Sequence, residues 1–411
     1  MHTAFINKFA TYFIGAFLVA ILNYAFYPIL GRMLDLVSFG ELQTLISILT
    51  LFGIVLGALV TIVVHAVASK GSVAEVADDL QKLQSVVATL TIIGVLVGIL
   101  LIPALKMYLQ FTSTFPFFLL YVCVFTTLVA SVSTALLQGV QDFFKTSILN
   151  ISQSAVKLVV ATACVFFGMG ISGAMLGLIA ASTSAYFFVK KSVGFIPLVI
   201  HFSPRAFFAD VLSVKELLRF GVTVLLAQSA IAFLFTFDMI IVKALFSPDE
   251  AGLYAGITSI AKIAFFALTP MSTVLLPMVS AAKGDRSLLV ITAGTILLLM
   301  TAVGLTIVYL FPVLLTQILF GNKYTSFSYI LPVVATGMAF LGLIQNITAY
   351  GLALRATILG KVLPCSALMF AVLCFFIHET IMDIAINFTA STGTCLVVLC
   401  SYYLRERYRY S

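Results

Sequence analysis

Long, nearly uninterrupted apolar stretches constrain this chain more than any other feature of its sequence. A helix needs about 20 apolar residues to cross a hydrocarbon core of roughly 30 Å, and the chain contains twelve stretches of about that length. They are too long and too uniformly apolar to be the alternating strands of a membrane barrel, which have about ten residues each. We therefore expect an all-α polytopic membrane protein. Its twelve transmembrane helices are expected near residues 9–31, 42–67, 85–105, 115–138, 146–167, 171–189, 217–243, 252–279, 288–312, 328–352, 362–378 and 381–403.

The composition excludes the soluble classes of protein. Hydrophobic residues make up 62% of the 411 residues and charged residues only 9%, whereas an ordinary soluble domain carries about 25% charged residues. So few charged side chains cannot cover a soluble fold of this size. We expect the lipid bilayer to be the main partner of the protein surface.

The loop cations predict an orientation. If the N-terminus is cytoplasmic, sixteen Lys and Arg residues in loops or at span ends lie on the cytoplasmic side and four on the other, namely Arg32, Lys106, Lys243 and Lys323. Cytoplasmic loops of membrane proteins carry such an excess of Lys and Arg. We therefore expect a multi-pass protein of the cell (inner) membrane with both termini in the cytoplasm. This bias also accounts for the net charge of +7. The sequence contains no basic run with interleaved aromatic residues, so it does not indicate a nucleic-acid partner.

The sequence lacks the usual motifs of enzymes and metal proteins. Its six cysteines all lie in apolar stretches without a CxxC pair, and its four histidines show no metal-ligand spacing. Phosphate-binding loops, HExxH and GxSxG are absent. We expect no catalytic residue, no metal and no cofactor.

The longest polar connection, about 190–216, lies in the middle of the chain. Short sequence echoes recur on either side of it at offsets of 211 to 213 residues. The echoes pair Lys8-Phe9-Ala10 with Arg219-Phe220-Gly221, Phe39-Gly40 with Ala251-Gly252, and Lys70-Gly71 with Lys283-Gly284. With six spans per half, the two copies have the same orientation, so the repeat is parallel. We expect an N-terminal six-helix bundle at 1–190, a cytoplasmic linker at 191–216, a C-terminal six-helix bundle at 217–411, and a central cleft between the bundles.

Two lysines lie deep inside expected spans. Lys157 is about eleven residues into its span and Lys262 about ten, which places each roughly 15 Å from a membrane surface at a rise of 1.5 Å per residue. A lysine at the bilayer centre costs about 2.5–3.5 kcal/mol on insertion scales and marks function by default. The alternative is a lysine that snorkels or is paired internally, although the midplane is too deep for easy snorkelling.

Polar neighbours share the helical face of each lysine. They are Asn150 and Gln153 beside Lys157, and Thr258, Ser259 and Thr269 beside Lys262. We expect a water-accessible cavity whose substrate-binding residues are Lys157, Lys262, Gln153, Asn150 and Ser259.

Span 115–138 carries a stripe of Thr and Ser that continues to Gln138 and Gln141. This stripe has two interpretations. Ser and Thr commonly serve helix packing in membranes, so the stripe either lines the cavity or packs against a neighbour. Pairs of glycines such as Gly53 and Gly57, or Gly173 and Gly177, predict close helix contacts.

Asp238 is the only acid well inside a span. A partly desolvated carboxylate changes protonation state near neutral pH, so Asp238 is a candidate site for a coupling H+ or Na+. Alternatively, it pairs with Lys243 at the surface. Other possible partners, near the start of the last span, are Glu379, Asp383 and Asn387.

Two segments carry a resemblance to a known family. The segment 27–34, Tyr-Pro-Ile-Leu-Gly-Arg-Met-Leu, followed by Phe-Gly-Glu-Leu at 39–42, resembles the opening of polysaccharide (oligosaccharide, O-antigen type) flippases. The second half resembles them again at 237–243 and 251–256, and Pro-Met-Val-Ser at 277–280 ends its span as in those proteins. These flippases belong to the multidrug/oligosaccharidyl-lipid/polysaccharide exporter superfamily.

The resemblance implies a function. It implies translocation of a polyprenyl-diphosphate-linked oligosaccharide from the cytoplasmic to the outer leaflet by cation-coupled alternating access, for surface polysaccharide biosynthesis. It also implies that Lys262 meets the lipid diphosphate and that Asp238 couples transport to a cation. The first span lacks the midplane Arg of the lipid II flippases, and there are twelve spans instead of fourteen; both departures count against a lipid II substrate.

Two other functions compete. A cation-coupled exporter of drugs or metabolites has the same architecture, but two deep lysines favour an anionic substrate. A membrane-embedded polysaccharide polymerase would be expected to carry a large outer loop with catalytic groups, whereas the longest loop here is expected inside.

Overall fold

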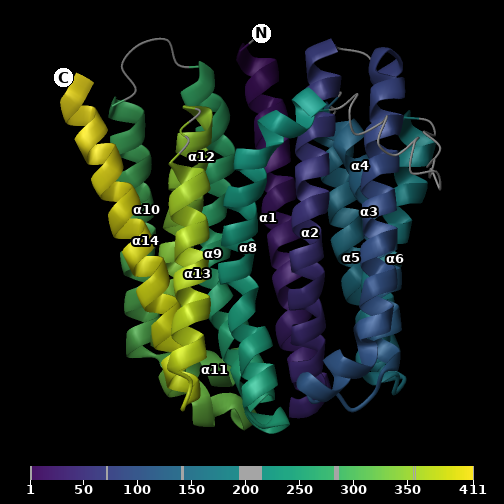
Figure 1. The fold of residues 1–411 in the computed structure, drawn as a ribbon, viewed down its shortest axis with the longest axis vertical. Helices are drawn as coiled ribbons and strands as arrows, with labels where there is room; N and C mark the ends of the chain where they lie inside the picture. Colours follow the sequence, from purple (N-terminus) through teal and green to yellow (C-terminus); the bar gives the residue numbers. More distant parts are fainter. Residues whose placement is uncertain are drawn as a thin grey trace. The chain divides into compact units, whose positions relative to one another are not determined.

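The computed structural model describes residues 2–70, 73–139, 143–193, 215–281, 287–354, 356 and 358–410. Over these residues the regular structure is entirely helical, as expected from the long apolar stretches. The chain forms two compact units, Met1–Val222 and Thr223–Ser411. Figure 1 shows their long helices.

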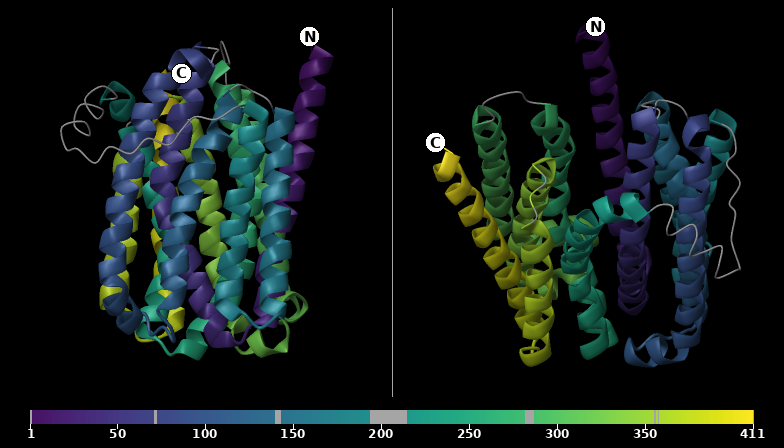
Figure 2. Two further views of the ribbon diagram at one scale, coloured as in Figure 1. Left: turned by 90° about the vertical axis from the view of Figure 1, so that its right-hand side faces the viewer. Right: turned by 45° about the horizontal axis from the view of Figure 1, so that its top comes forward.

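The first unit contains six long helices with short connections. They are α1 (His2–Met33), α2 (Leu36–Lys70), α3 (Val73–Tyr108), α4 (Phe115–Gly139), α5 (Phe143–Phe166) and α6 (Gly170–Val193). Helix α5 packs against α6 and α1, while α4 packs against α6 and α2. Figure 2 shows these helices lying lengthwise beside one another.

The second unit is built around α12. Its elements are α8 (Lys215–Leu245, which begins shortly before the unit boundary), α9 (Pro248–Ala281), α10 (Ser287–Leu310), α11 (Pro312–Phe320), the 3-10 helix η1 (Asn322–Ile330), α12 (Leu331–Ala353), α13 (Leu359–Phe376) and α14 (Ile381–Tyr410). Helix α12 packs most extensively against α9 and α14. The short α11 and η1 close one end of this unit beneath α9 (Figure 1).

Each of the twelve expected spans coincides with one long helix. Within the described residues, ten helices are long and apolar enough to cross a membrane. The other two, in spans 9–31 and 115–138, are represented by the shorter apolar segments Leu18–Met33 and Phe115–Ser131. No membrane span is expected over 313–327, and this segment is helical as well, in α11 and η1. The expected linker 191–216 lies almost wholly outside the described residues.

Large apolar side chains remain exposed along α3 and α10. Leu96 and Leu100 on α3, and Leu298 and Leu299 on α10, are each more than half exposed. Apolar surface of this extent is costly in water but matches the acyl chains of a bilayer. These faces therefore agree with a membrane-embedded bundle.

Close packing between α5 and α6 depends on small residues. A Cβ atom added at Gly177 would lie 2.5 Å from Ala161 Cβ, and one at Gly173 would lie 2.8 Å from Cys164 Cβ. The predicted close contact is therefore confirmed for this pair of glycines. Gly53 differs, because a Cβ atom there would meet no described atom within 4 Å.

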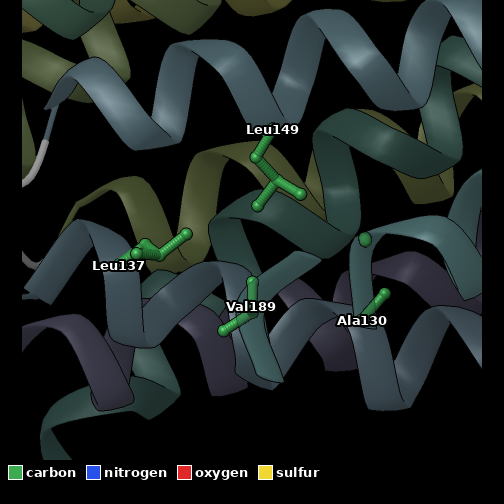
Figure 3. Packing of buried hydrophobic residues seen from close by; sticks show 5 residues of the cluster. Ala130, Leu137, Leu149 and Val189 are labelled. Atoms are coloured by element: carbon green, nitrogen blue, oxygen red, sulfur yellow. The ribbon is translucent and has the colours of Figure 1, made fainter. Parts of the chain in front are cut away.

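Apolar residues of α4, α5 and α6 form a separate buried cluster. Figure 3 shows Ala130, Leu137, Leu149 and Val189 of this cluster. Lipid tails are as apolar as leucine, so such clusters stabilise a membrane bundle through tight packing and not through exclusion of water.

The polar stripe of α4 also takes part in packing. The Thr127 hydroxyl lies 3.2 Å from that of Ser182 on α6, and Ser131 and Thr134 donate hydrogen bonds to carbonyl groups of their own helix. These contacts favour the packing interpretation for the three α4 residues. The side chains of Gln138 and Gln141 lie outside the described part of the chain.

The α5–α6 contact predicts the effect of adding one methyl group. Gly177→Ala should destabilise the protein by about 1–3 kcal/mol, because the new Cβ atom overlaps Ala161 and the helices must separate. The matched control is Gly304→Ala on the exposed face of α10, where nothing described lies within 4 Å of the new atom. Alanine there should be neutral or stabilising, since glycine is the weaker helix former by about 0.5–1 kcal/mol. Thermal unfolding in detergent measures both, and equal stability of the two variants would contradict the prediction.

Candidate functional site

Asp238 on α8 is completely buried, with 0% of its side chain exposed. Its Oδ2 atom accepts hydrogen bonds from the Tyr254 hydroxyl at 2.9 Å and from the Thr258 hydroxyl at 3.1 Å. Both donors lie on α9, one helical turn apart. The Oδ1 atom of Asp238 is also buried and has no hydrogen-bond partner among the described residues. Both side-chain hydrogen bonds to the carboxylate thus come from α9.

Lys262 occupies the next turn of α9 and is only 8% exposed. Its Nζ atom lies 4.6 Å from the centroid of the Phe235 ring on α8. Phe235 precedes Asp238 by three residues, so both contacts join the same faces of α8 and α9 on consecutive turns. The ammonium of Lys262 and the carboxylate of Asp238 also interact electrostatically. They therefore form a buried cluster of opposite charges.

The expected alternative, a surface pair between Asp238 and Lys243, is wrong. Neither side chain is at a surface, because each is 0% exposed. Residues five apart on a helix do not share a face, and the contacts of Asp238 come from α9.

The residues near the start of α14 have a different role from the one considered in the sequence. The Asp383 carboxylate accepts a hydrogen bond from the Thr380 backbone N–H at 2.8 Å, and the Asp383 N–H donates to the Thr380 hydroxyl at 3.2 Å. This reciprocal pair caps the helix. Asn387 donates to the Ile377 carbonyl at 2.7 Å. These contacts fix the α13–α14 connection.

Lys157 on α5 faces α1 within the first unit. Its Nζ atom donates a hydrogen bond to Asn23 Oδ1 and lies 4.8 Å from the centroid of the Phe26 ring. Asn23 in turn donates through Nδ2 to the Ser154 hydroxyl at 3.1 Å, and Ser154 donates to the Asn150 carbonyl at 2.9 Å. The lysine therefore does not snorkel; polar and aromatic groups of α1 and α5 hold it inside the unit.

The remaining predicted site residues differ in their surroundings. Asn150 and Gln153 are half-buried on α5 near Lys157. Ser259 is buried, and its hydroxyl donates to the Ala255 carbonyl of its own helix at 2.7 Å. Its oxygen is thus already used in an intrahelical bond. The role of all three in substrate binding stays a prediction.

Sequence reasoning missed the partners of the buried charges. Asn23 is an isolated amide within an apolar span, and Ser154 is one of several polar residues in its span. Tyr254 is one of 15 tyrosines and Phe235 one of 37 phenylalanines. A search for every amide within a span would have found Asn23. No sequence pattern marked Phe235 or Tyr254, because their contacts with the buried charges depend on how α8 and α9 face each other.

The two lysines differ in the charge of their partners. Lys157 is held by a neutral amide and a neutral ring, so these contacts leave its positive charge in place. Lys262 lies over a ring as well, but beside a carboxylate that offsets its charge. Cation–π contacts contribute about 0.5–2 kcal/mol, which eases burial of an ammonium without neutralising it. Such sites attract anions.

Comparison with known families and structures adds independent evidence on the fold and the family. The family described as "Polysaccharide biosynthesis protein" matches residues 5–283. No match is found among curated protein sequences.

Several solved transporters are similar in fold. An inward-facing multidrug resistance MATE family transporter of the MOP superfamily has a TM-score of 0.72 at 14% identity, covering 95% of this chain and 94% of that one. The lipid II flippase MurJ in an inward closed conformation has a TM-score of 0.76 at 14% identity, covering 95% and 87%. The MATE transporter VcmN (D35N mutant) of Vibrio cholerae has a TM-score of 0.61 at 16% identity, covering 97% and 98%. At such identities the similarity shows a shared fold.

The contact between α8 and α9 predicts the effect of removing one hydroxyl. Tyr254→Phe keeps the ring but deprives the buried Asp238 carboxylate of a donor, and hydrogen bonds to charged groups contribute about 1.5–3 kcal/mol. The variant should lose stability by that amount in thermal unfolding. Tyr309→Phe is the matched control, since the Tyr309 hydroxyl contacts Thr336 at an exposed position and its loss should cost about 0.5 kcal/mol. Equal losses of stability in the two variants would show that the hydrogen bond to Asp238 stabilises the protein no more than an exposed one.

Proposed function

The chain belongs to the polysaccharide biosynthesis protein family, and from this premise we propose that it is a flippase for a polyprenyl-diphosphate-linked oligosaccharide. It is a multi-pass membrane protein with the fold of MATE transporters and of a lipid II flippase. In the proposed reaction the lipid-linked sugar moves from the cytoplasmic to the outer leaflet of the cell (inner) membrane, by alternating access of its site to the two sides. Both termini are cytoplasmic in this proposal.

The observation that carries the proposal is the pair of buried ammonium groups, and above all Lys157 with its neutral partners. A lipid-linked sugar cannot cross a bilayer unaided, because its hydroxyls and its diphosphate would lose their hydration. Buried ammonium groups offset this cost for the diphosphate, while the polyprenyl chain remains in lipid. A lysine suits a substrate that must be released, since it acts as a point charge without the rigid fork of arginine.

Polar side chains near Lys157 supply contacts to the sugar. Asn150 and Gln153 are half-buried on the same helix, and their amides both donate and accept hydrogen bonds, as sugar hydroxyls require. Ser259 contributes less, because its hydroxyl already bonds to its own helix.

Asp238 couples transport to a cation, either H+ or Na+. A carboxylate in a low-dielectric interior gains strongly from a proton or a metal cation. Its completely buried position and its unpartnered Oδ1 atom support this role.

Replacement of either deep lysine should abolish most of the transport. Lys157→Gln and Lys262→Gln each remove an ammonium but keep most of the volume, and loss of one partner of a buried charge contact costs about 2–5 kcal/mol. Transport in proteoliposomes should therefore fall at least about thirtyfold. It is measured as the appearance of polyprenyl-diphosphate-linked oligosaccharide that a glycosidase on the outside can reach.

The matched control is Lys145→Gln, which changes an exposed lysine on the same helix as Lys157 and should leave the rate unchanged. Wild-type rates in both deep-lysine variants would contradict the anion site. Export of cationic dyes by the wild type, without movement of the lipid-linked sugar, would instead favour the drug exporter.

Asp238→Asn should uncouple transport from the ion gradient. The amide keeps the shape of the carboxylate but cannot take up a proton or pair with a cation. An imposed H+ or Na+ gradient should accelerate the wild type and have no effect on the variant. Asp249→Asn, at an exposed position where α9 begins, should respond to the gradient like the wild type. Acceleration of the Asp238 variant by the gradient would exclude this residue from coupling.

A further inference from the structure

The apolar surface of α10 continues past the end of its span into α11. Within α10 the segment Ile291–Leu310 has 20 residues, enough to cross a hydrocarbon core of roughly 30 Å at a rise of 1.5 Å per residue. Leu310 and Phe311, at the end of that segment, are each more than half exposed. Helix α11 therefore begins where the hydrocarbon core ends, at one end of the second unit (Figure 1).

The backbone separates α11 from its neighbours in sequence. Phe311 has a non-helical conformation, with φ −131° and ψ 45°, and Pro312 begins the new helix, where the missing N–H of proline costs nothing. Gly321 ends the helix with φ +92°, a conformation that residues with a Cβ atom rarely adopt. With nine residues, α11 is about 14 Å long. It is too short to cross the membrane by itself.

The two faces of α11 differ in their surroundings. Thr316 and Phe320, one turn apart, are completely buried, and the helix packs against α9 and η1. The other face carries large apolar side chains that are each at least half exposed, namely Val313, Leu314 and Ile318. The described residues of the second unit thus leave an apolar surface open on this side of α11.

Helix η1 prevents α11 from turning this surface inward. The Tyr324 ring of η1 is completely buried and lies edge-on to the Phe320 ring, with the centroids 5.3 Å apart. The same ring packs so closely on Gly256 of α9 that a Cβ atom added there would overlap it. Phe320 and Tyr324 therefore lock the rotation of α11 against α9.

The exposed side chains change from apolar to polar between α11 and η1. Those of η1 include Asn322, Lys323 and Ser326. Tyr309, shortly before α11, and Tyr329, near the end of η1, are more than half exposed, and tyrosines gather where acyl chains meet headgroups. This end of the unit thus has the order of groups that a membrane–water boundary requires.

We propose that α11 is an interfacial helix, which lies along the membrane surface with its apolar face among the phospholipid acyl chains next to the headgroups, while η1 faces water. Such helices bury their apolar face roughly 5–10 Å into this boundary. Lipid is the occupant because the face continues the lipid-facing surface of α10 through Leu310 and Phe311. The docking does not depend on the flippase function; in the orientation proposed above, the lipids belong to the outer leaflet.

The experiment uses the absence of tryptophan from the chain, since a single introduced tryptophan then reports only its own surroundings. Leu314→Trp and Ile318→Trp are made in the full-length protein and reconstituted into phosphatidylcholine vesicles. The acyl chains are brominated either near the headgroup or near the methyl end. Bromine near the headgroup should quench each tryptophan about twofold more strongly than bromine near the methyl end. The two variants should behave alike, since a helix along the bilayer normal would separate them by about 6 Å in depth.

Two matched variants calibrate the depth. Leu299→Trp replaces an exposed side chain near the middle of α10, and bromine near the methyl end should quench it more strongly. Ser326→Trp lies at an exposed position of η1, and aqueous iodide should quench it while neither lipid does. Thermal unfolding in detergent shows which variants are folded, and Val313→Trp, on the same face of α11, replaces a test variant that is not.

Three results would overturn the proposal. Quenching of Leu314→Trp and Ile318→Trp by iodide, without an effect of bromine, would place the face in water. Protection from both quenchers would show that protein, such as a second copy of this chain, covers it. Stronger quenching by bromine near the methyl end, as for Leu299→Trp, would make α11 part of a span. None of these results affects the proposed flippase function, which depends on the buried lysines.

Discussion

The cost of placing charges in an apolar interior governs the arrangement of the helices around them. An isolated ammonium or carboxylate loses many kcal/mol of solvation in a low-dielectric medium, so each needs a partner from a neighbouring helix. Lys157 finds an amide and a ring on α1, and Asp238 finds two hydroxyls on α9. These contacts fix the rotation of α1 against α5 and of α8 against α9, because any other rotation would turn the charge toward lipid.

Packing elsewhere must hold the helices rigidly enough for these contacts to persist. In a membrane there is no exclusion of water to press helices together, so close approach depends on small residues. Gly173 and Gly177 bring α6 to van der Waals distance of α5, the helix that carries Lys157. A polar contact between hydroxyls of α4 and α6 joins a third helix to this arrangement. The position of Lys157 thus depends in part on two glycines of the neighbouring helix.

The sequence predicts the helices well but not their rotation. Span length follows from bilayer thickness, and for that reason every expected span coincides with a helix. The depth of Lys157 and Lys262 likewise follows from counting residues. Their partners do not: Asn23 lies 134 residues from Lys157, and only the tertiary structure selects it. The expected pairing of Asp238 with Lys243 used proximity in sequence, which fails when two residues point to different sides of one helix. No expected span covers 313–327, because polar residues interrupt the apolar stretch there, yet this segment forms α11 and a 3-10 helix over 322–330.

The asymmetry between the two units addresses a general problem of transport. A site that binds a diphosphate tightly enough to remove it from water also retains it, unless its affinity changes during the cycle. In the proposed flippase, Lys157 lies beside the amide of Asn23, which does not ionise, whereas Lys262 lies one helical turn from Thr258, which holds the ionisable Asp238 carboxylate. If transport is coupled through Asp238, as proposed, a ligand of this carboxylate changes the affinity for the anion, and the anion changes the affinity for that ligand by the same factor.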